Sequence, residues 1–306
     1  MIVSTAAEFR AAYGDGSRFP PRAVPCLRAA LLVSPHGFAV SPESATDNAY
    51  MSAGTSINTE RAHAQHLGVA RKLLELGVPV LTFPGHDNLP DGIYPNNAFA
   101  TANRHLIVGS MCHPQRRRET AREDIRSFFT GQLGYGLRDL SGTGVVAELT
   151  GPLVIDRARQ IGFCGLSSRA DRAGCGSMHE AFELELTFCF ELVTREYHTN
   201  LILAVLAGRA CVLYPESFRD PEVPAAVASV YGFATVRLDD AEKNAFAGNC
   251  IALGERDVLF SQTALQALRP SSRATLEAHG FELHAVEIDE LEKGGGSLRC
   301  LIAEVF

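Results

Sequence analysis

The segment KGGGSLRC at 293–300 carries the strongest local signal for chemistry. Glycine loses more backbone entropy on folding than any other residue, so three in a row indicate a sharp turn or a backbone that passes close to a ligand. Cys300 follows this turn and, we expect, opens the strand CLIAEVF. It is a candidate nucleophile, although a cysteine at the start of a strand is more often buried and unreactive.

A cysteine nucleophile needs an acid or base beside it, and histidine is the usual one. The segment YHTN at 197–200 opens the apolar strand LILAVL. Alternation of side chains along a strand would place His198 and Asn200 on one face. The alternative is a structural histidine at the start of a capped strand. Glu148 precedes another apolar segment, LVI at 153–155, and is weak evidence when taken alone.

Two further polar segments have simple structural interpretations. PDGIYPNN at 90–97 combines aspartate, glycine, proline and asparagine, which is typical of tight turns. Arg116–Arg118 is the main basic cluster, and a short charge run at the start of a helix usually faces water. We therefore expect a turn and a solvated helix start at these positions.

Metal and cofactor chemistry have little support in the sequence. His63 and His66 share a helix face, but no third ligand of fitting spacing accompanies them. The glycine run lacks the Lys-Ser/Thr that follows a phosphate-binding loop. We expect neither a metal nor a cofactor.

Composition narrows the class of protein. The net charge of −7 argues against a nucleic-acid partner, because such a protein needs positive charge to displace phosphate counterions. The sequence has neither a secretory signal nor an apolar run of the ~20 residues that cross a bilayer. Eight scattered cysteines in a long chain read as reduced thiols, most of them buried. We expect a cytoplasmic protein with a small-molecule partner and no membrane partner; its oligomeric state stays open, a homo-oligomer included.

One pattern recurs along the chain: a helix-like stretch ends near a glycine and a short strand follows at once. It occurs around Gly77, Gly134, Gly232 and Gly280, as expected for a glycine just past a helix end. A fifth copy without the glycine would run from Met178 into FCFELV at 188–193. Five helix–strand units at intervals of about 50 to 60 residues favour units around a central axis. The alternative is a mixed α/β domain with accidental repeats. No linker divides the chain, so we expect one domain over 1–306.

Five motifs occur in one order, and together they resemble the guanidino-group-modifying superfamily. This group includes arginine deiminase, dimethylarginine dimethylaminohydrolase, succinylarginine dihydrolase and the amidinotransferases. The resemblance covers about residues 30–306, and within the superfamily the sequence is most similar to the citrulline-utilisation hydrolase branch. It implies an α/β fold, the five-bladed ββαβ propeller (pentein). The motifs are GFAVSPESATDNAYM at 37–51, PDGIYPNN, YHTN, FAGN at 246–249 and GGGSLRCLIAEVF, with Glu148 upstream of GLSSRAD.

Carried over motif by motif, the resemblance implies that Cys300 is the nucleophile and His198 the general acid and base. Glu148 would orient that histidine. Arg116 and Arg169 match positions that grip the substrate's α-carboxylate in arginine deiminases.

The same resemblance assigns the substrate-binding positions. Asp91 and the nearby Tyr94 match substrate-contacting positions, and Asn97 and Asn200 stand where deiminases carry aspartates. A guanidinium is a cation with donors only, whereas asparagine offers both a donor and an acceptor and so matches a neutral ureido group. This departure favours citrulline over arginine.

We therefore expect a hydrolase that acts on non-peptide carbon–nitrogen bonds and converts citrulline to ornithine, carbon dioxide and ammonia through a covalent Cys300 intermediate. Because Asp91 and Glu148 could still pair with a cation, an arginine deiminase, a dihydrolase or a dimethylarginine dimethylaminohydrolase-like enzyme is the alternative. The third hypothesis is a catalytically silent propeller that serves as a binding module. The presence of Cys300, His198 and Glu148 argues against it.

Overall fold

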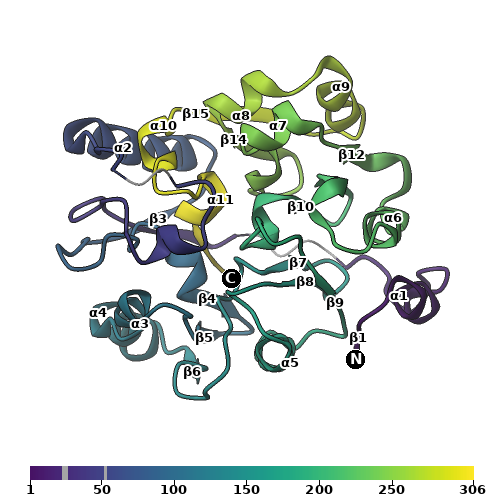
Figure 1. Cartoon of the computed structure of the whole chain (residues 1–306), viewed down its shortest axis with the longest axis horizontal. Coiled ribbons are helices and arrows are strands. Elements are labelled where there is room, and N and C mark those ends of the chain that lie inside the picture. The colour runs from purple at the N-terminus through teal and green to yellow at the C-terminus, as the bar shows by residue number, and fades with distance from the viewer. Residues whose placement is uncertain (23–26, 52–53) are drawn as a thin grey trace.

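The computed structural model describes residues 1–22, 27–51 and 54–306, and Cys26 lies outside them. In this part of the chain, five small sheets stand around a common centre, with helices on the outside (Figure 1). In each sheet an antiparallel pair of strands is followed by a helical connection and a third, parallel strand. The expected five ββαβ units are thus confirmed.

Blades 1 to 3 follow one another along the chain. The first contains β2 (Ala29–Val33), α2 (Thr59–Glu75) and β3 (Val80–Phe83), and the second contains β4 (Phe99–Ala102), β5 (His105–Val108), α3 (Pro114–Thr120), α4 (Glu123–Ser127) and β6 (Gly136–Asp139). The third contains β7 (Leu153–Asp156), β8 (Ile161–Leu166), α5 (Arg172–Ala181) and β9 (Leu186–Glu191), with β1 (Ile2–Val3) added at its edge and α1 (Ala6–Tyr13) following β1.

Blades 4 and 5 complete the ring. The fourth contains β10 (Leu203–Leu206), β11 (Ala210–Leu213), α6 (Glu222–Ser229) and β12 (Thr235–Arg237), followed by α7 (Asp240–Asn244). The fifth contains β13 (Ile251–Ala252), β14 (Asp257–Ser261), α8 (Gln262–Ala267), α9 (Pro270–Ala278) and β15 (Glu282–Val286). After α10 (Asp289–Glu292) and α11 (Leu298–Leu301), the last strand β16 (Ala303–Val305) pairs antiparallel with β2 and so joins the end of the chain to the first blade.

The turn from helix to third strand explains the glycine repeat. Gly77, Gly134, Gly232 and Gly280 all have a positive φ, between 57° and 80°, which glycine adopts without steric cost. In blade 3 the same place is taken by Glu183, with a φ of 54°. The fifth unit therefore has the same turn without the glycine, and its helix and strand begin at 172 and 186, earlier than predicted.

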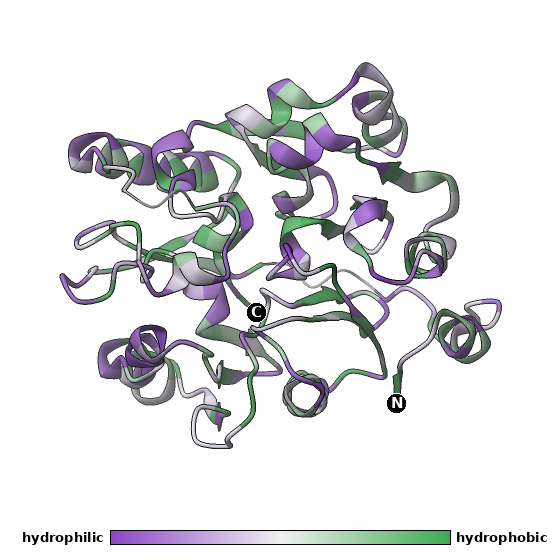
Figure 2. Ribbon diagram, viewed as in Figure 1, coloured by the Kyte–Doolittle hydropathy of each residue, from purple (hydrophilic) through white to green (hydrophobic). Residues whose placement is uncertain are grey.

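The first strand of every blade lines the centre, where β10 packs against both β7 and β13, and β16 against β4. The strands are predominantly apolar, whereas the outer helices carry polar residues on their exposed sides (Figure 2). No helix within the described ranges combines the length and hydropathy of a membrane span. Six of the seven described cysteines are buried, and all seven are free thiols.

Two local expectations were wrong. Cys300 does not open a strand but lies in the single helical turn α11, and β16 begins three residues later. His198 precedes a 3₁₀ turn, Thr199–Leu201, and β10 starts only at Leu203. Strand alternation therefore does not relate His198 to Asn200; a helical turn before the inner strand does.

Candidate active site

The inner strands all begin at the same end of the propeller axis, and each is preceded by a polar or nucleophilic residue. These residues are Asn97, Thr150, Asn200, Asn249 and Cys300, at intervals of about fifty positions. Three of them are joined by hydrogen bonds: the amide nitrogen of Asn249 donates to the carbonyl of Asn200 at 2.8 Å, and that of Asn200 donates to the carbonyl of Thr150 at 3.0 Å. The fivefold arrangement thus places side chains from distant segments around one point.

Cys300 is the member of this ring that can act as a nucleophile. Its thiol is 1 % exposed, and the side-chain amides of Asn249 and Asn200 lie 3.5 and 3.8 Å from Sγ. Burial raises the pKa of Cys300, while contacts with Ser297 and Asn249 oppose that rise. The resting sulfur is therefore a thiol at neutral pH and needs a base or a bound cation to ionise.

The glycine run brings the chain against this sulfur. A Cβ on Gly294 would lie 2.4 Å from the hydroxyl of Tyr94, and Gly295 has a φ of 75°. The carbonyl of Gly295 accepts a hydrogen bond from Tyr197 at 2.6 Å. Larger residues would push this backbone away from the tyrosines. The predicted sharp turn is thus confirmed, and a close approach of this backbone to a ligand stays a prediction.

His198 and Glu148 form a fully buried pair. Nε2 of His198 lies 2.9 Å from Glu148, which leaves Nδ1 without a hydrogen-bond partner among the described residues. Burial lowers the pKa of His198 to about 4, although the Glu148 carboxylate opposes this effect. An imidazole that donates from Nε2 to Glu148 has its free lone pair on Nδ1, where it can accept a proton.

Two buried arginines hold Glu148 from its other side. Arg169 donates from Nη1 at 3.3 Å, and Nη1 of Arg116 lies 3.7 Å away. Burial alone would raise the pKa of Glu148, but Arg169, His198 and Arg116 together hold it well below its usual range. Glu148 therefore stays ionised while it orients the imidazole.

The remaining donors of both arginines are also paired. Arg169 makes a two-bond pair with Asp47, at 2.8 and 2.6 Å, and Arg116 makes one with Glu119, at 3.1 and 2.8 Å. Arg116 is 3 % exposed, so the expectation of a water-facing charge run fails for it. Because carboxylates of the chain already occupy these donors, the contacts show support for Glu148; the grip on a substrate α-carboxylate stays a prediction.

A pocket of about 270 Å³, counting its open part, lies above Cys300. Asp91, Tyr94 and Asn97 line it, as do both arginines. Oδ1 of Asp91 and Oδ1 of Asn97 are buried and accept no hydrogen bond from the described residues. Burial raises the pKa of Asp91, against the opposing charge of Arg116. The pocket therefore presents free acceptors and suits a ligand rich in N–H groups.

The structure brings the predicted residues to one end of the axis, but three of them do not line this pocket: Asn200, which lies beside the sulfur, His198 and Glu148. Tyr197 does line it, and its ring is tilted against that of His198 with centroids 4.5 Å apart. No hydrogen bond joins Cys300 to His198 in the described chain; Tyr197 adjoins both.

Sequence reasoning missed four residues of the site. Asn249 stands before β13 as Asn200 stands before β10, so the repeat carried a signal for it. Glu119 is three residues after Arg116 on α3, a spacing that pairs charges on a helix. Asp47 and Ser44, which donates to Asp91, lie in the motif at 37–51, to which the resemblance assigned no site residue.

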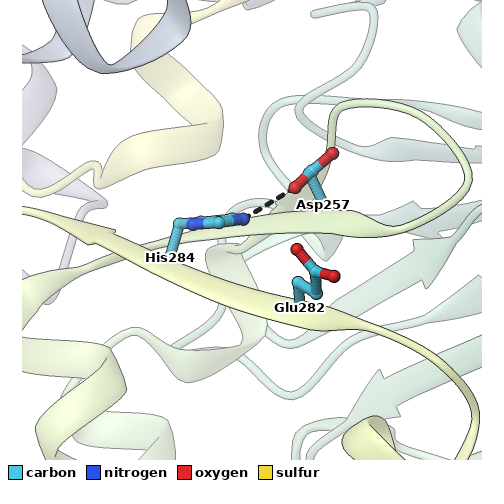
Figure 3. Close-up of side chains that lie close together, drawn as sticks. All are labelled: Asp257, Glu282 and His284. Carbon is cyan, nitrogen blue, oxygen red and sulfur yellow. Dashed lines mark hydrogen bonds and ion pairs between the residues drawn. The ribbon is translucent and has the colours of Figure 1, made fainter. Parts of the chain in front are cut away.

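One group of three potential metal ligands occurs in the described part of the chain, and it lies outside this pocket. Asp257, Glu282 and His284 lie at the start of β14 and along β15, with His284 2.7 Å from Asp257 (Figure 3). Glu282 is exposed and already pairs with Arg256. Nothing in the group connects it with the catalytic residues.

Comparison with known proteins agrees with this geometry. A family model described as N,N dimethylarginine dimethylhydrolase, eukaryotic, matches residues 34–306. The N(G),N(G)-dimethylarginine dimethylaminohydrolase of Mycobacterium tuberculosis is 26 % identical over 94 % of this chain and 88 % of its own. An uncharacterized protein of Caenorhabditis elegans, ZK1307.1, is 22 % identical over 92 % of this chain and 94 % of its own.

Solved structures share the fold. The N-terminal domain of ArgZ, an arginine dihydrolase of cyanobacteria, superimposes with a TM-score of 0.79 at 18 % identity, covering 90 % of this chain and 97 % of that one. The dimethylarginine dimethylaminohydrolase of Pseudomonas aeruginosa, solved with citrulline, gives 0.71 at 18 % identity, covering 92 % and 100 %. None of these relatives is described as a citrulline-utilisation hydrolase, so that branch stays a prediction. The chain belongs to the N,N-dimethylarginine dimethylhydrolase family, within the guanidino-group-modifying superfamily of pentein propellers.

Proposed function

We propose that this protein hydrolyses a carbon–nitrogen bond in the guanidino or ureido group of a small arginine-related amino acid. The observation that carries the proposal is the position of Tyr197, which lines the pocket with Cys300 and whose ring lies 4.5 Å from that of His198. His198 in turn pairs with Glu148 at 2.9 Å, so the thiol and this pair lie at one end of the axis. Family membership supports the same class of reaction.

Each group has a defined task in this reaction. The Cys300 thiol gives its proton to His198, and the sulfur adds to the central carbon of the substrate. His198 gives this proton to the departing nitrogen, the C–N bond breaks, and the carbon stays bonded to sulfur. His198 then takes a proton from water, whose oxygen adds to the same carbon, and the C–S bond breaks as His198 returns that proton to the sulfur.

For citrulline the balance is simple. The amine that leaves is ornithine, and the group held on sulfur is a carbamoyl. Water releases it as carbamate, which breaks down to carbon dioxide and ammonia. Asn97 supports this substrate, because its amide can serve both the carbonyl and the NH₂ of a neutral ureido group.

A guanidino substrate is the second candidate, and Asp91 favours it. This carboxyl lines the pocket with one oxygen free, and a cation would hold it in its ionised form. A cation beside Cys300 would also favour its thiolate. Arginine, dimethylarginine and citrulline therefore all have to be assayed.

The two candidates differ in their dependence on Asp91. Because the pKa of Asp91 is raised, its charge is lost at a higher pH than that of an ordinary aspartate. The kcat/KM for a guanidinium substrate should then fall as Asp91 becomes protonated, whereas the kcat/KM for citrulline should not depend on the ionisation of Asp91. Asn97→Asp should improve kcat/KM for arginine relative to citrulline, with Asn103→Asp at an exposed position as the control.

Ammonia and amino-acid products measured for wild type and Cys300→Ser test the class of reaction. We expect turnover of at least one of the three substrates by the wild type and its loss in the variant. Wild-type turnover by Cys300→Ser would rule the covalent scheme out, and absence of turnover by the wild-type protein on any ureido or guanidino compound would favour a silent binding module.

A further inference from the structure

A second hollow lies at the far ends of the inner strands, opposite the ends that Asn97, Thr150, Asn200, Asn249 and Cys300 precede. It encloses about 640 Å³, including its part open to solvent. A neighbouring pocket of about 780 Å³, also counting its open part, shares Ile155, Arg157 and Phe306 with it. Arg157 directly follows β7, and Phe306 follows β16. Because the catalytic residues precede these strands, the hollow lies away from the catalytic pocket. We call it the basic hollow.

Its charge is unusual for this chain. Arg28, Arg104 and Arg157 line it, and no aspartate or glutamate does. The other polar lining residues, Asn103 and Gln160, carry no charge. In a protein of net charge −7, three arginines around one hollow form a local positive site.

The arginines also have free donors. Within residues 1–22, 27–51 and 54–306, none of the three donates a side-chain hydrogen bond. Arg157 is the most enclosed: its side chain is 16 % exposed, and its nearest carboxylate, Glu304, lies 3.8 Å away and is held at 2.6 Å by Arg299. The Arg157 guanidinium stacks on the ring of Phe306 at 3.8 Å instead.

A largely enclosed cation with only a distant, shared carboxylate is costly, since much of its hydration is lost for little compensating charge. Burial lowers the pKa of Arg157 to about 10; the Glu304 carboxylate opposes this effect, and the neighbouring Arg299 adds to it. Guanidinium groups bind planar or tetrahedral oxyanions with two parallel hydrogen bonds. The stacked Phe306 ring holds the guanidinium plane in place for such contacts.

We propose that the basic hollow binds a small oxyanion, a carboxylate or phosphate group, with Arg157 as the main contact and Arg104 and Arg28 at the rim. The apolar side chains of Phe182 and Leu184 in the same wall would cover the organic part of a larger ligand. This site goes beyond the proposed function, and its test does not use catalysis.

Titration calorimetry at constant ionic strength tests the site with inorganic phosphate and succinate as separate probes and chloride as the control. We expect saturable binding of at least one probe, with a Kd of about 1 mM or tighter. Phosphate alone would mark a phosphate site, and succinate alone a carboxylate site. Chloride should give no saturable heat.

Arg157→Gln should weaken binding at least about tenfold, because a hydrogen bond to a charged group is worth about 1.5–3 kcal/mol. Arg118→Gln, which removes an exposed arginine on α3, should leave the Kd unchanged. If Arg157→Gln does not fold, Arg104→Gln at the exposed rim serves instead. Unchanged affinity in these variants, or no saturable binding of either probe by the wild type, would overturn the proposal.

Discussion

The two ends of the propeller axis use arginine in different ways. At the catalytic end, Arg116 and Arg169 are buried and have carboxylate partners on every side. At the far end, Arg157 is nearly as enclosed but lacks a close carboxylate of its own. The two paired arginines hold the carboxylate that contacts His198, whereas Arg157 has only a distant carboxylate, which Arg299 shares, and keeps its hydrogen-bond donors for the proposed ligand. Burial alone therefore does not tell the role of a cation; its partners do.

The largest effect on activity should come from replacing His198, which pairs with Glu148 at the end of the axis where the arginines have carboxylate partners. His198→Gln keeps a polar side chain but removes the proton acceptor at Nδ1. We expect kcat to fall about 10³-fold, the middle of the range for a general acid and base. Steady-state kinetics measure it. A tenfold effect or less, in a variant that melts like the wild type, would show that the pair is structural.

Removing one cation from each end compares them directly. Arg116→Gln leaves Glu119 buried without its two-bond partner, and breaking such a pair costs about 3–5 kcal/mol of unfolding free energy. Arg157→Gln should cost less than about 1 kcal/mol, because Glu304 keeps Arg299. Urea unfolding measures both. Equal losses of unfolding free energy in the two variants would contradict this difference between the two arginines.

Acid should weaken the catalytic end through His198. Its pKa is about 4 in the fold and 6.5 in the unfolded chain, so the unfolded state binds more protons between these values. The stabilising contribution is complete above pH 6.5 and is lost as the pH falls through about 4, by about 3 kcal/mol. Unfolding free energies between pH 7 and 4 should fall less steeply in His198→Gln. If the unfolding free energies of variant and wild type fell in parallel with pH, His198 would not be the origin of this acid sensitivity.

Asn249 should have the smallest effect. Its amide contacts Sγ of Cys300 and the carbonyl of Asn200, and its Oδ1 accepts from the backbone of Arg299 at 2.9 Å. Asn249→Ala should lower kcat about tenfold, the cost of one or two lost hydrogen bonds to the nucleophile's support. Asn103→Ala, at the other end, is the matched control and should not change kcat. If Asn249→Ala and Asn103→Ala had the same kcat, Asn249 would have no role in supporting Cys300.

The repeat was predictable because its physical cause is local. A helix that must reverse into a strand needs a positive φ, and glycine marks four of the five turns; Glu183 hides the fifth. The catalytic ring follows from the same repeat, since each inner strand is preceded by one functional position. The starts of β10 and β16 were misplaced because a short helical turn precedes each strand, and the apolar residues at the ends of these turns, Leu201 and Leu301, resemble the beginning of a strand.

The partners of the arginines were less accessible to sequence reasoning. Arg169 and Asp47 are 122 positions apart, and only the closed ring brings them together. The basic hollow shows the same limit, because Arg28, Arg104 and Arg157 come from three separate segments. Spacing along the chain contains no sign of either group.

Mass spectrometry of the peptide containing Cys300, after rapid quenching with citrulline or arginine, tests the covalent scheme most directly. We predict an added group on Cys300: a carbamoyl from citrulline, or the amidino-type fragment from arginine. The adduct should be absent from Cys300→Ser. In His198→Gln it should form and decay more slowly than in the wild type, because that variant lacks the group that protonates the departing nitrogen and activates water. Turnover without any adduct on Cys300, or with an adduct on another residue, would contradict the account.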